Sequence, residues 1–129
     1  MNPAIPSLLL VAIGGALGSV LRYGVGRWVI ALTGPGFPFG TFAVNIVGGF
    51  LMGLLAGWLA RHSDGGEELR LLLGVGVLGG FTTFSAFSLE VYNMITRAEV
   101  ALAAAYAVSS VAGSVLAVLA GVWAMRSLA

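Results

Sequence analysis

The chain has 129 residues, of which 59% are hydrophobic and only 9% are charged. Soluble domains carry roughly 25% charged residues, and a small one has too little interior to hide so much apolar surface. The composition therefore predicts an integral membrane protein, with residues 1–129 forming one membrane domain. It excludes a soluble enzyme and, because the arginines are scattered, a nucleic-acid partner. The lack of cysteine excludes disulfides and thiolate metal sites.

Charged residues divide the sequence into apolar runs that are long enough to cross a bilayer. A spanning helix needs about 20 mostly apolar residues. Four such helices are predicted, near residues 6–31, 40–61, 69–96 and 99–126. A segment with two prolines and three glycines, Thr33 to Gly40, forms the first loop. The predicted fold class is an all-α membrane protein with four transmembrane helices.

The arginines give almost no signal about orientation. In the predicted topology, one side of the membrane carries Arg61, Arg70 and Arg126. The other side carries Arg27 and Arg97, and Arg22 lies one to two helical turns inside the membrane on that side. An excess of Lys and Arg in short loops normally sets the orientation. Two alternatives stay open, a single orientation and insertion in both orientations (dual topology).

Small residues recur at every fourth position along the predicted helices. The series are Gly14 and Gly18, then Gly49, Gly53 and Gly57, then Gly113, Ala117 and Gly121. This spacing puts each series on one helix face, where two backbones can approach closely. We expect most of these contacts within the monomer. Four helices are too few to enclose a pathway, so a remaining face is expected to serve a second copy in a homo-oligomer.

Polar residues gather in the middle of the third predicted helix, where lipid makes them costly. Residues 79–90 read Gly-Gly-Phe-Thr-Thr-Phe-Ser-Ala-Phe-Ser-Leu-Glu. Glycine and β-branched threonine weaken a helix, so we predict a break near residues 79–83. Unwound backbone at this depth must be buried in protein or line a cavity. Its carbonyls suit a cation such as sodium, and its amides suit an anion. The alternative is a glycine-hinged helix whose hydroxyls bond back to the preceding turn.

Several side chains near this segment are candidates for anion binding. Phe84 and Phe87 share a helix face and can present their weakly positive ring edges, although core packing also explains them. The amide of Asn45 either binds an anion or ties helices together. Arg22 needs a partner or water at its depth, and Glu90 is a candidate to pair with an arginine.

Hydroxyl groups also recur along the fourth predicted helix. Tyr106, Ser110 and Ser114 are four residues apart, so they form one stripe. These hydroxyls either form hydrogen bonds between helices or line a hydrated path through the membrane. The dinucleotide-like Gly-x-Gly-x-x-Gly at residues 74–79 lies inside an apolar span rather than after a strand, so we reject it. No catalytic constellation is present in the sequence, and we predict that the protein is not an enzyme.

Together these motifs resemble the Fluc (CrcB) family of fluoride channels. The resemblance is carried by residues 79–88, Gly15 to Tyr23, Gly40 to Gly49 and the hydroxyl stripe, and it covers essentially the whole chain. It implies an antiparallel, dual-topology homodimer in the lipid of a bacterial inner membrane. It also implies two passive fluoride pathways per dimer. Members often carry a hydroxyl residue where this chain has Ala86.

The resemblance implies roles for individual residues. The fluoride pathway would include an aromatic box and polar side chains, namely Asn45, Phe84, Phe87, Thr41, Ser85, Tyr106, Ser110 and Ser114. Arg22 and Glu90 would lie at a vestibule or pore mouth. The backbone carbonyls of Gly79 and Thr82 from both subunits would hold a central structural sodium ion. No organic cofactor is implied.

Two other functions remain alternatives. A small dual-topology, proton-coupled multidrug transporter also has four helices, but it needs a carboxylate in its first helix, and this sequence has none there. A non-transporting scaffold subunit would explain the glycine series but not the polar cluster in the third helix. Crosslinking distinguishes these readings, because a scaffold associates with other chains whereas a channel functions when purified alone.

Overall fold

A computed structural model describes residues 4–62 and 64–128, and this part of the chain contains helices and no strand. The expected domain over residues 1–129 also includes residues 1–3, 63 and 129, which lie outside the described part. Four helical segments are long and apolar enough to cross a membrane: Ala4–Thr33, Phe39–Leu59, Gly66–Thr96 and Val100–Ser127. These bounds lie within three residues of the predicted ones, so the four-span helical class is confirmed.

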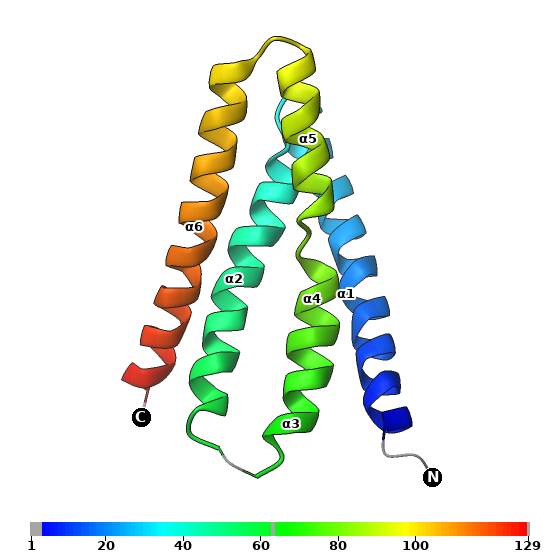
Figure 1. Cartoon of the computed structure of the whole chain (residues 1–129), viewed down its shortest axis with the longest axis vertical. Coiled ribbons are helices and arrows are strands. Elements are labelled where there is room, and N and C mark those ends of the chain that lie inside the picture. The colour runs from blue at the N-terminus through cyan, green and yellow to red at the C-terminus, as the bar shows by residue number, and fades with distance from the viewer. Residues whose placement is uncertain (1–3, 63, 129) are drawn as a thin grey trace.

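Three of the spans are continuous helices and the third is assembled from pieces (Figure 1). The continuous helices are α1 (Ala4–Thr33), α2 (Phe39–Leu59) and α6 (Val100–Ser127). The third span consists of α3 (Gly66–Leu69), the π-helix η1 (Arg70–Leu78), α4 (Gly79–Phe81) and α5 (Ser85–Thr96). The π-helix was not predicted from the sequence; this rare form, whose hydrogen bonds join residues five apart, is frequent at functional sites.

The predicted break in the third span is present, a few residues later than the glycines. Thr82 has extended backbone angles, with φ −84° and ψ 159°, and the helix resumes after Phe84. Gly79 and Gly80 remain helical. Gly80 stays in the helix because it packs on α1, where an added Cβ would lie 2.6 Å from the carbonyl oxygen of Gly15. The helix therefore ends after Phe81, and the backbone becomes extended at Thr82.

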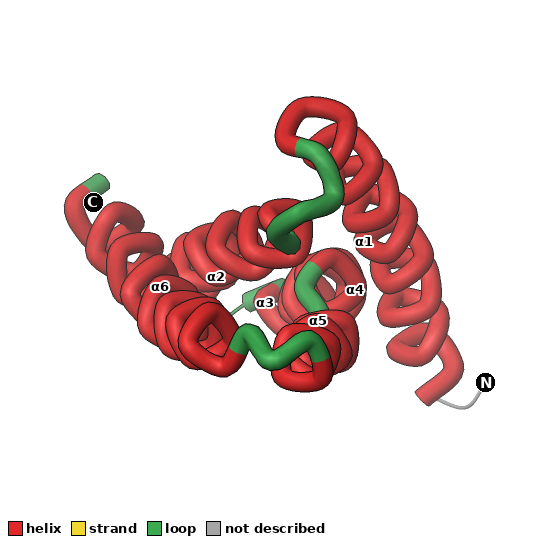
Figure 2. Tube along the Cα trace, turned by 90° about the horizontal axis from the view of Figure 1, so that it is seen from above, coloured by secondary structure: helices red, strands yellow, loops and turns green. Residues whose placement is uncertain are grey.

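The helices pack in an order that leaves the break beside α2 and α6. Figures 1 and 2 show α2 between α6 on one side and the third span on the other. The first helix packs along η1 and α4, and α5 packs against the beginning of α6. The two halves of the third span therefore contact different neighbours, and the unwound segment lies where they part.

The glycine series place backbones in direct contact within the monomer, as expected. An added Cβ on Gly53 would lie 3.0 Å from the Cα of Gly121 and would also meet the carbonyl oxygen of Val118. On the other side, an added Cβ on Gly18 would lie 2.8 Å from the amide nitrogen of Phe81. These approaches fix the position of α6 on α2 and of the third span on α1.

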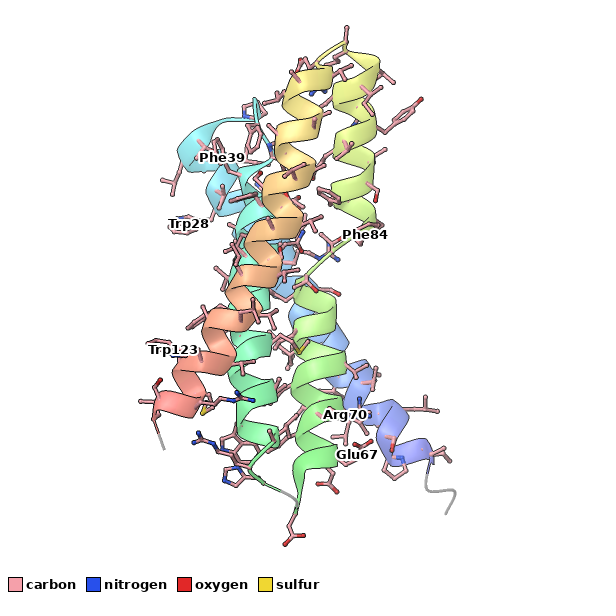
Figure 3. The ribbon with its side chains drawn as sticks, turned by 60° about the vertical axis from the view of Figure 1, so that its left-hand side comes forward. Trp28, Phe39, Glu67, Arg70, Phe84 and Trp123 are labelled. Carbon is pink, nitrogen blue, oxygen red and sulfur yellow. The ribbon has the colours of Figure 1, made fainter. Side chains whose placement is uncertain are left out.

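The outer surface exposes many large apolar side chains, and their contact with water would be energetically unfavourable. The accessible surface is 7923 Å², whereas a soluble monomer of this mass exposes roughly 6,400 Å². Only 11–22% of each spanning segment is buried. Trp28 and Trp123, which are 65% and 72% exposed, point outward from different levels (Figure 3), as aromatic residues at membrane interfaces do. The protein is a multi-pass integral membrane protein.

Candidate functional site

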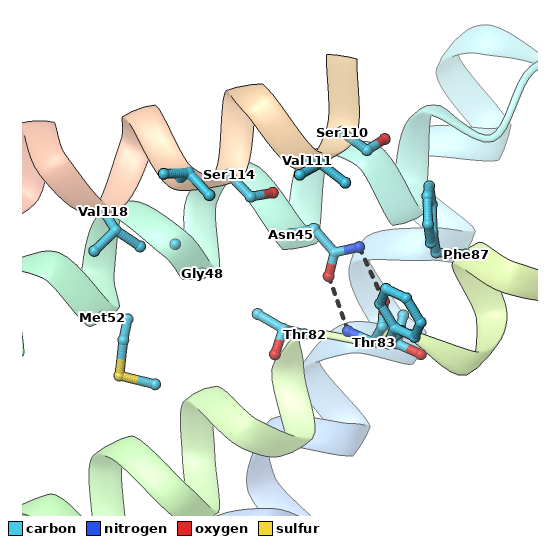
Figure 4. Close-up of a pocket in the computed structure, with 13 residues that line it drawn as sticks. Asn45, Gly48, Met52, Thr82, Thr83, Phe87, Ser110, Val111, Ser114 and Val118 are labelled. Carbon is cyan, nitrogen blue, oxygen red and sulfur yellow. Dashed lines mark hydrogen bonds between the residues drawn. The ribbon is translucent and has the colours of Figure 1, made fainter. Parts of the chain in front are cut away.

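A cavity of about 400 Å³ lies beside the break in the third span (Figure 4). Its lining comes from α2, the unwound segment, α5 and α6. The polar lining residues are Asn45, Thr82, Thr83, Ser110 and Ser114; the others are Gly48, Gly49, Met52, Phe84, Phe87, Val111, Val115 and Val118. Among these described residues there is no charged side chain. The cavity therefore offers hydrogen-bond donors in an apolar setting without a fixed charge.

Asn45 fastens α2 to the unwound segment. Its Nδ2 donates to the carbonyl oxygen of Thr83 at 3.0 Å, and its Oδ1 accepts from the amide of Thr83 at 2.8 Å (Figure 4). The backbone amide is always a donor, so this pair also fixes which way the Asn45 amide points. One N–H of Nδ2 stays without a partner in the described part of the chain. The expectation that Asn45 ties helices together is correct, and a donor remains for a ligand.

Ser110 places a second free donor at the same cavity. The side chain is 5% exposed, and its Oγ has no hydrogen-bond partner among the described residues. An unmade hydrogen bond at a buried hydroxyl costs about 1–3 kcal/mol, so a ligand that accepts a hydrogen bond here recovers that cost. Ser114 follows one turn later on α6 and lines the same cavity (Figure 4).

The rings of Phe84 and Phe87 meet at the edge of this cavity. Their centroids are 5.5 Å apart and their planes are inclined by 48°. The two differ in burial, since Phe87 is 8% exposed whereas Phe84 is 75% exposed and points outward from the break (Figure 3). Phe84 is the residue that precedes α5. In the single chain, Phe84 therefore lies partly outside the cavity it borders.

A second cavity of about 290 Å³ lies at the membrane end that carries the α1–α2 loop. Its polar lining includes Thr41, Glu90, Asn93 and Arg97. Glu90 accepts hydrogen bonds at 2.6 Å from both the Thr41 hydroxyl and the Tyr106 hydroxyl. The expectation that an arginine pairs with Glu90 is wrong, because Arg97 pairs with Glu99 and two hydroxyls hold the Glu90 carboxylate instead.

Tyr106 and Phe87 separate the two cavities. Tyr106 is 1% exposed, and its ring lies 5.2 Å from the ring of Phe87 and 5.2 Å from that of Phe37. The Tyr106 ring faces Phe87, which lines the first cavity, while its hydroxyl reaches Glu90 at the second. Thus Tyr106 connects the hydroxyl stripe on α6 to the carboxylate.

The remaining predicted site residues lie around the break. Arg22 donates from Nε to the carbonyl oxygen of Gly80 at 3.0 Å. Ser85 is exposed, with its Oγ 3.5 Å from Oγ1 of Thr83, and does not line either cavity. The amide of Thr83 bonds to Asn45, so the carbonyl of Gly79 loses its usual helix donor. The amide of Ala86 bonds to Oγ1 of Thr83, which likewise frees the carbonyl of Thr82.

Sequence reasoning missed several of these participants. Thr83 is the partner of Asn45, and only its place in the polar cluster pointed to it. Asn93 and Arg97 follow Glu90 by three and seven residues, which signals one helix face at the second cavity. Phe37 contacts Tyr106 edge-on, but it lies in a loop that the sequence marks only as a helix breaker. No pattern in the sequence identifies that contact.

Known proteins are similar to this chain over most of its length. Residues 9–122 match the family described as CrcB-like protein, Camphor Resistance (CrcB). A fluoride-specific ion channel FluC of Novosphingobium aromaticivorans is 59% identical over 121 residues, which cover 92% of this chain and 95% of that protein. Proteins with the same name from Phenylobacterium zucineum and Rhizobium leguminosarum are 58% and 54% identical, covering 93% and 94% of this chain and 95% and 97% of theirs. The chain therefore belongs to the CrcB-like family of membrane proteins.

Proposed function

We propose that the protein is a fluoride-selective, passive ion channel that exports fluoride from the cytoplasm. The observation that carries this proposal is the pair of unused donors, the Ser110 hydroxyl and one N–H of Asn45, at a cavity without charged lining residues in the described chain. The relatives named as fluoride-specific ion channels support the same function. Fluoride accepts hydrogen bonds and holds its water strongly, so a selective path must replace that water with donors.

The chemistry of the cavity favours passage over tight binding. Neutral donors and weakly positive ring edges stabilise an anion less than a fixed positive charge does. A conducting site must release its ion as readily as it accepts it. Chloride is larger and would be excluded from a narrow path lined by Phe84 and Phe87. The negative potential inside a cell would then drive fluoride outward without an energy source.

The path would continue from the first cavity past Tyr106 to the second. The hydroxyls of Tyr106 and Thr41 already donate to Glu90, so they become available to fluoride only by turning away from the carboxylate. While the anion passes, these hydroxyls would donate to fluoride, and Glu90 would briefly accept fewer hydrogen bonds. Arg97 and Asn93 line the cavity at the exit.

We also propose that the channel is an antiparallel, dual-topology homodimer with two pathways. Two features support it: the near balance of arginines between the two sides, and the 75% exposure of Phe84. A second copy over the break would cover this ring and complete the wall of the cavity. Each half of the dimer would then contain one pathway.

A structural sodium ion fits the carbonyls that the break releases. The carbonyl oxygens of Gly79 and Thr82 would hold it, together with their counterparts in the second subunit. Both have lost their helix donors, because the amides of Thr83 and Ala86 bond elsewhere. Backbone oxygens suit a hard monovalent cation. The ion would supply positive charge that holds the broken segments of two subunits together.

Anion efflux from liposomes that contain the purified protein tests the function. Fluoride and chloride electrodes would record the two ions side by side. We expect rapid fluoride loss without chloride loss, abolished by Phe84→Ile. Leu89→Ile is the matched control, because this exposed apolar residue of α5 lines neither cavity. No fluoride loss from well-folded dimers would overturn the proposal and favour a transporter or scaffold.

A further inference from the structure

The break in the third span leaves a carbonyl that a side chain from another helix takes over. In a continuous helix, the carbonyl of Gly80 would accept from the amide four residues later, that of Phe84. Phe84 instead precedes the new helix α5. The carbonyl of Gly80 accepts from Nε of Arg22 at 3.0 Å, across 58 residues of sequence. Arg22 therefore supplies the donor that the break removes.

The packing of α1 on α4 directs Arg22 to this carbonyl. An added Cβ on Gly80 would lie 2.6 Å from the carbonyl oxygen of Gly15 and 3.1 Å from the amide nitrogen of Ser19. The two backbones are therefore in direct contact one turn before Arg22. From this register the side chain reaches the end of α4, where the half-buried hydrogen bond forms.

The charge of Arg22 suits the end of a helix. The last carbonyls of η1 and α4 carry the partial negative charge of a helix C-terminus, and a cation there is stabilising. Hydrogen bonds that involve a charged group contribute about twice as much as neutral ones. The Nη atoms of Arg22 have no hydrogen-bond partner within residues 4–62 and 64–128. The structure thus gives this arginine one protein partner, which is the backbone of the break.

We propose that Arg22 is a positioning residue of the pathway, which holds the backbone just before the break while Asn45 holds it just after. Arg22 fixes the carbonyl of Gly80, and Asn45 fixes both backbone groups of Thr83. Thr82, the extended residue between these two attachments, then presents its carbonyl at a set position, and Phe84 follows directly after the second attachment. This inference rests on the proposed fluoride pathway for its functional consequence, but its structural part can be tested separately.

Hydrogen exchange in lipid nanodiscs tests the structural part directly. Arg22→Met removes both charge and donor but keeps an unbranched side chain. We expect the hydrogen-bonded amides of the break, those of Thr83 and Ala86, to exchange about tenfold faster in this variant, as the loss of one charge-assisted hydrogen bond implies, with unchanged exchange in α2 and α6. Arg22→Lys, whose ammonium lies one bond beyond the position of Nε, should restore most of the protection. Arg27→Met is the control, since Arg27 contacts only Tyr23 in the described chain.

Fluoride efflux from the same preparations gives the functional readout. We expect Arg22→Met to lower the fluoride rate, Arg22→Lys to restore it, and Arg27→Met to leave it unchanged. Unchanged exchange at Thr83 and Ala86 in Arg22→Met overturns the inference, even where fluoride efflux falls. Faster exchange spread evenly over all four spans also overturns it, because that indicates a general loss of stability. Absence of efflux in the unmodified protein contradicts the proposed function instead, and leaves the exchange result to decide the role of Arg22.

Discussion

Asn45 and Thr83 form a closed pair of hydrogen bonds between α2 and the unwound segment of the third span. The side-chain amide of Asn45 matches the backbone of Thr83 in both directions, donating at 3.0 Å and accepting at 2.8 Å. It therefore behaves like a neighbouring strand that supplies one donor and one acceptor. An unwound backbone in a membrane must find such partners within the protein. The same side chain both stabilises the break and offers its second N–H to the cavity.

Replacing Asn45 by aspartate should strongly reduce fluoride efflux. Asp retains the acceptor for the amide of Thr83 but loses the donor, and it adds a negative charge at an anion path. A hydrogen bond to a charged group is worth roughly 1.5–3 kcal/mol, and about 1.4 kcal/mol changes a rate tenfold. By these figures the lost donor reduces efflux by about tenfold to a hundredfold, and the added negative charge lowers it further. The measurement is fluoride efflux from liposomes at equal dimer content.

Asn45→Ala is the matched comparison, because it removes both hydrogen bonds without adding charge. It should reduce efflux less than Asn45→Asp while lowering thermal stability more. Wild-type efflux through Asn45→Asp would contradict a role for this amide in the path.

Replacing Ser110 by alanine should separate function from stability. The variant removes a buried hydroxyl that has no partner in the described chain. Stability should stay equal or rise, because burying an unmade hydrogen bond costs about 1–3 kcal/mol. Fluoride efflux should fall by about tenfold, since one donor to the anion contributes roughly 1.5 kcal/mol. Melting in detergent micelles and liposome efflux measure the two effects.

Ser109→Ala is the control on the adjacent position, because the Ser109 hydroxyl donates to the backbone carbonyl of Tyr106 and lines neither cavity. It should leave efflux unchanged. If Ser110→Ala lowered stability and left the flux intact, the hydroxyl would be structural.

The spans could be predicted because they depend on local properties. Charge and apolar length along the chain mark where each helix can lie in a bilayer. The position of the break depends in addition on what each residue contacts. The glycines and threonines predicted a break near residues 79–83, and the extended backbone lies within this range at Thr82, after the glycines, which remain helical. The π-helix η1 was not predictable either, because no residue pattern in the sequence distinguishes it from an α-helix.

The residue types of the site could be predicted, but their partners could not. Asn45, Tyr106 and Ser110 are conspicuous because polar groups are costly in a membrane span. Their hydrogen bonds connect residues that are far apart in sequence, 38 positions for Asn45 and Thr83 and 49 for Thr41 and Glu90. Such pairs depend on how the helices are stacked. Whether a donor is used or free is likewise a property of the packed structure.

Adding a methyl group at Gly53 should disrupt the packing of α2 on α6. The new Cβ would lie 3.0 Å from the Cα of Gly121 and closer still to the carbonyl oxygen of Val118. Backbone on both sides leaves no room to adjust, so Gly53→Ala should cost about 1–3 kcal/mol or more. Gly24→Ala is the control, because nothing lies within 4 Å of its Cβ position. It should stabilise α1 by about 1 kcal/mol, the usual gain of alanine over glycine in a helix.

Melting temperature and dimer content after extraction measure this difference. Equal melting of the two variants would contradict direct backbone contact between α2 and α6.

Tyr106→Phe should destabilise the protein through the carboxylate of Glu90. The variant removes one of two hydroxyl donors, each 2.6 Å from that carboxylate, and leaves Thr41 as the other. The loss should cost about 1–3 kcal/mol, the penalty for a buried group that loses a partner. Glu90→Gln should recover most of this cost in the double variant, because a neutral amide needs fewer donors. Denaturant titration in micelles measures the four variants of the cycle.

Tyr92→Phe is the control, since Tyr92 is 61% exposed and has no hydrogen bond in the described chain. A cycle in which the effects of Tyr106→Phe and Glu90→Gln simply add would argue against their coupling.

Fluoride efflux supplies an independent readout. Tyr106→Phe leaves the ring between the cavities but removes the hydroxyl that would be handed from Glu90 to the anion, so it should slow efflux. Because the ring also contacts Phe37 and Phe87, Tyr106→Leu removes these ring contacts as well and should lower stability more than Tyr106→Phe does.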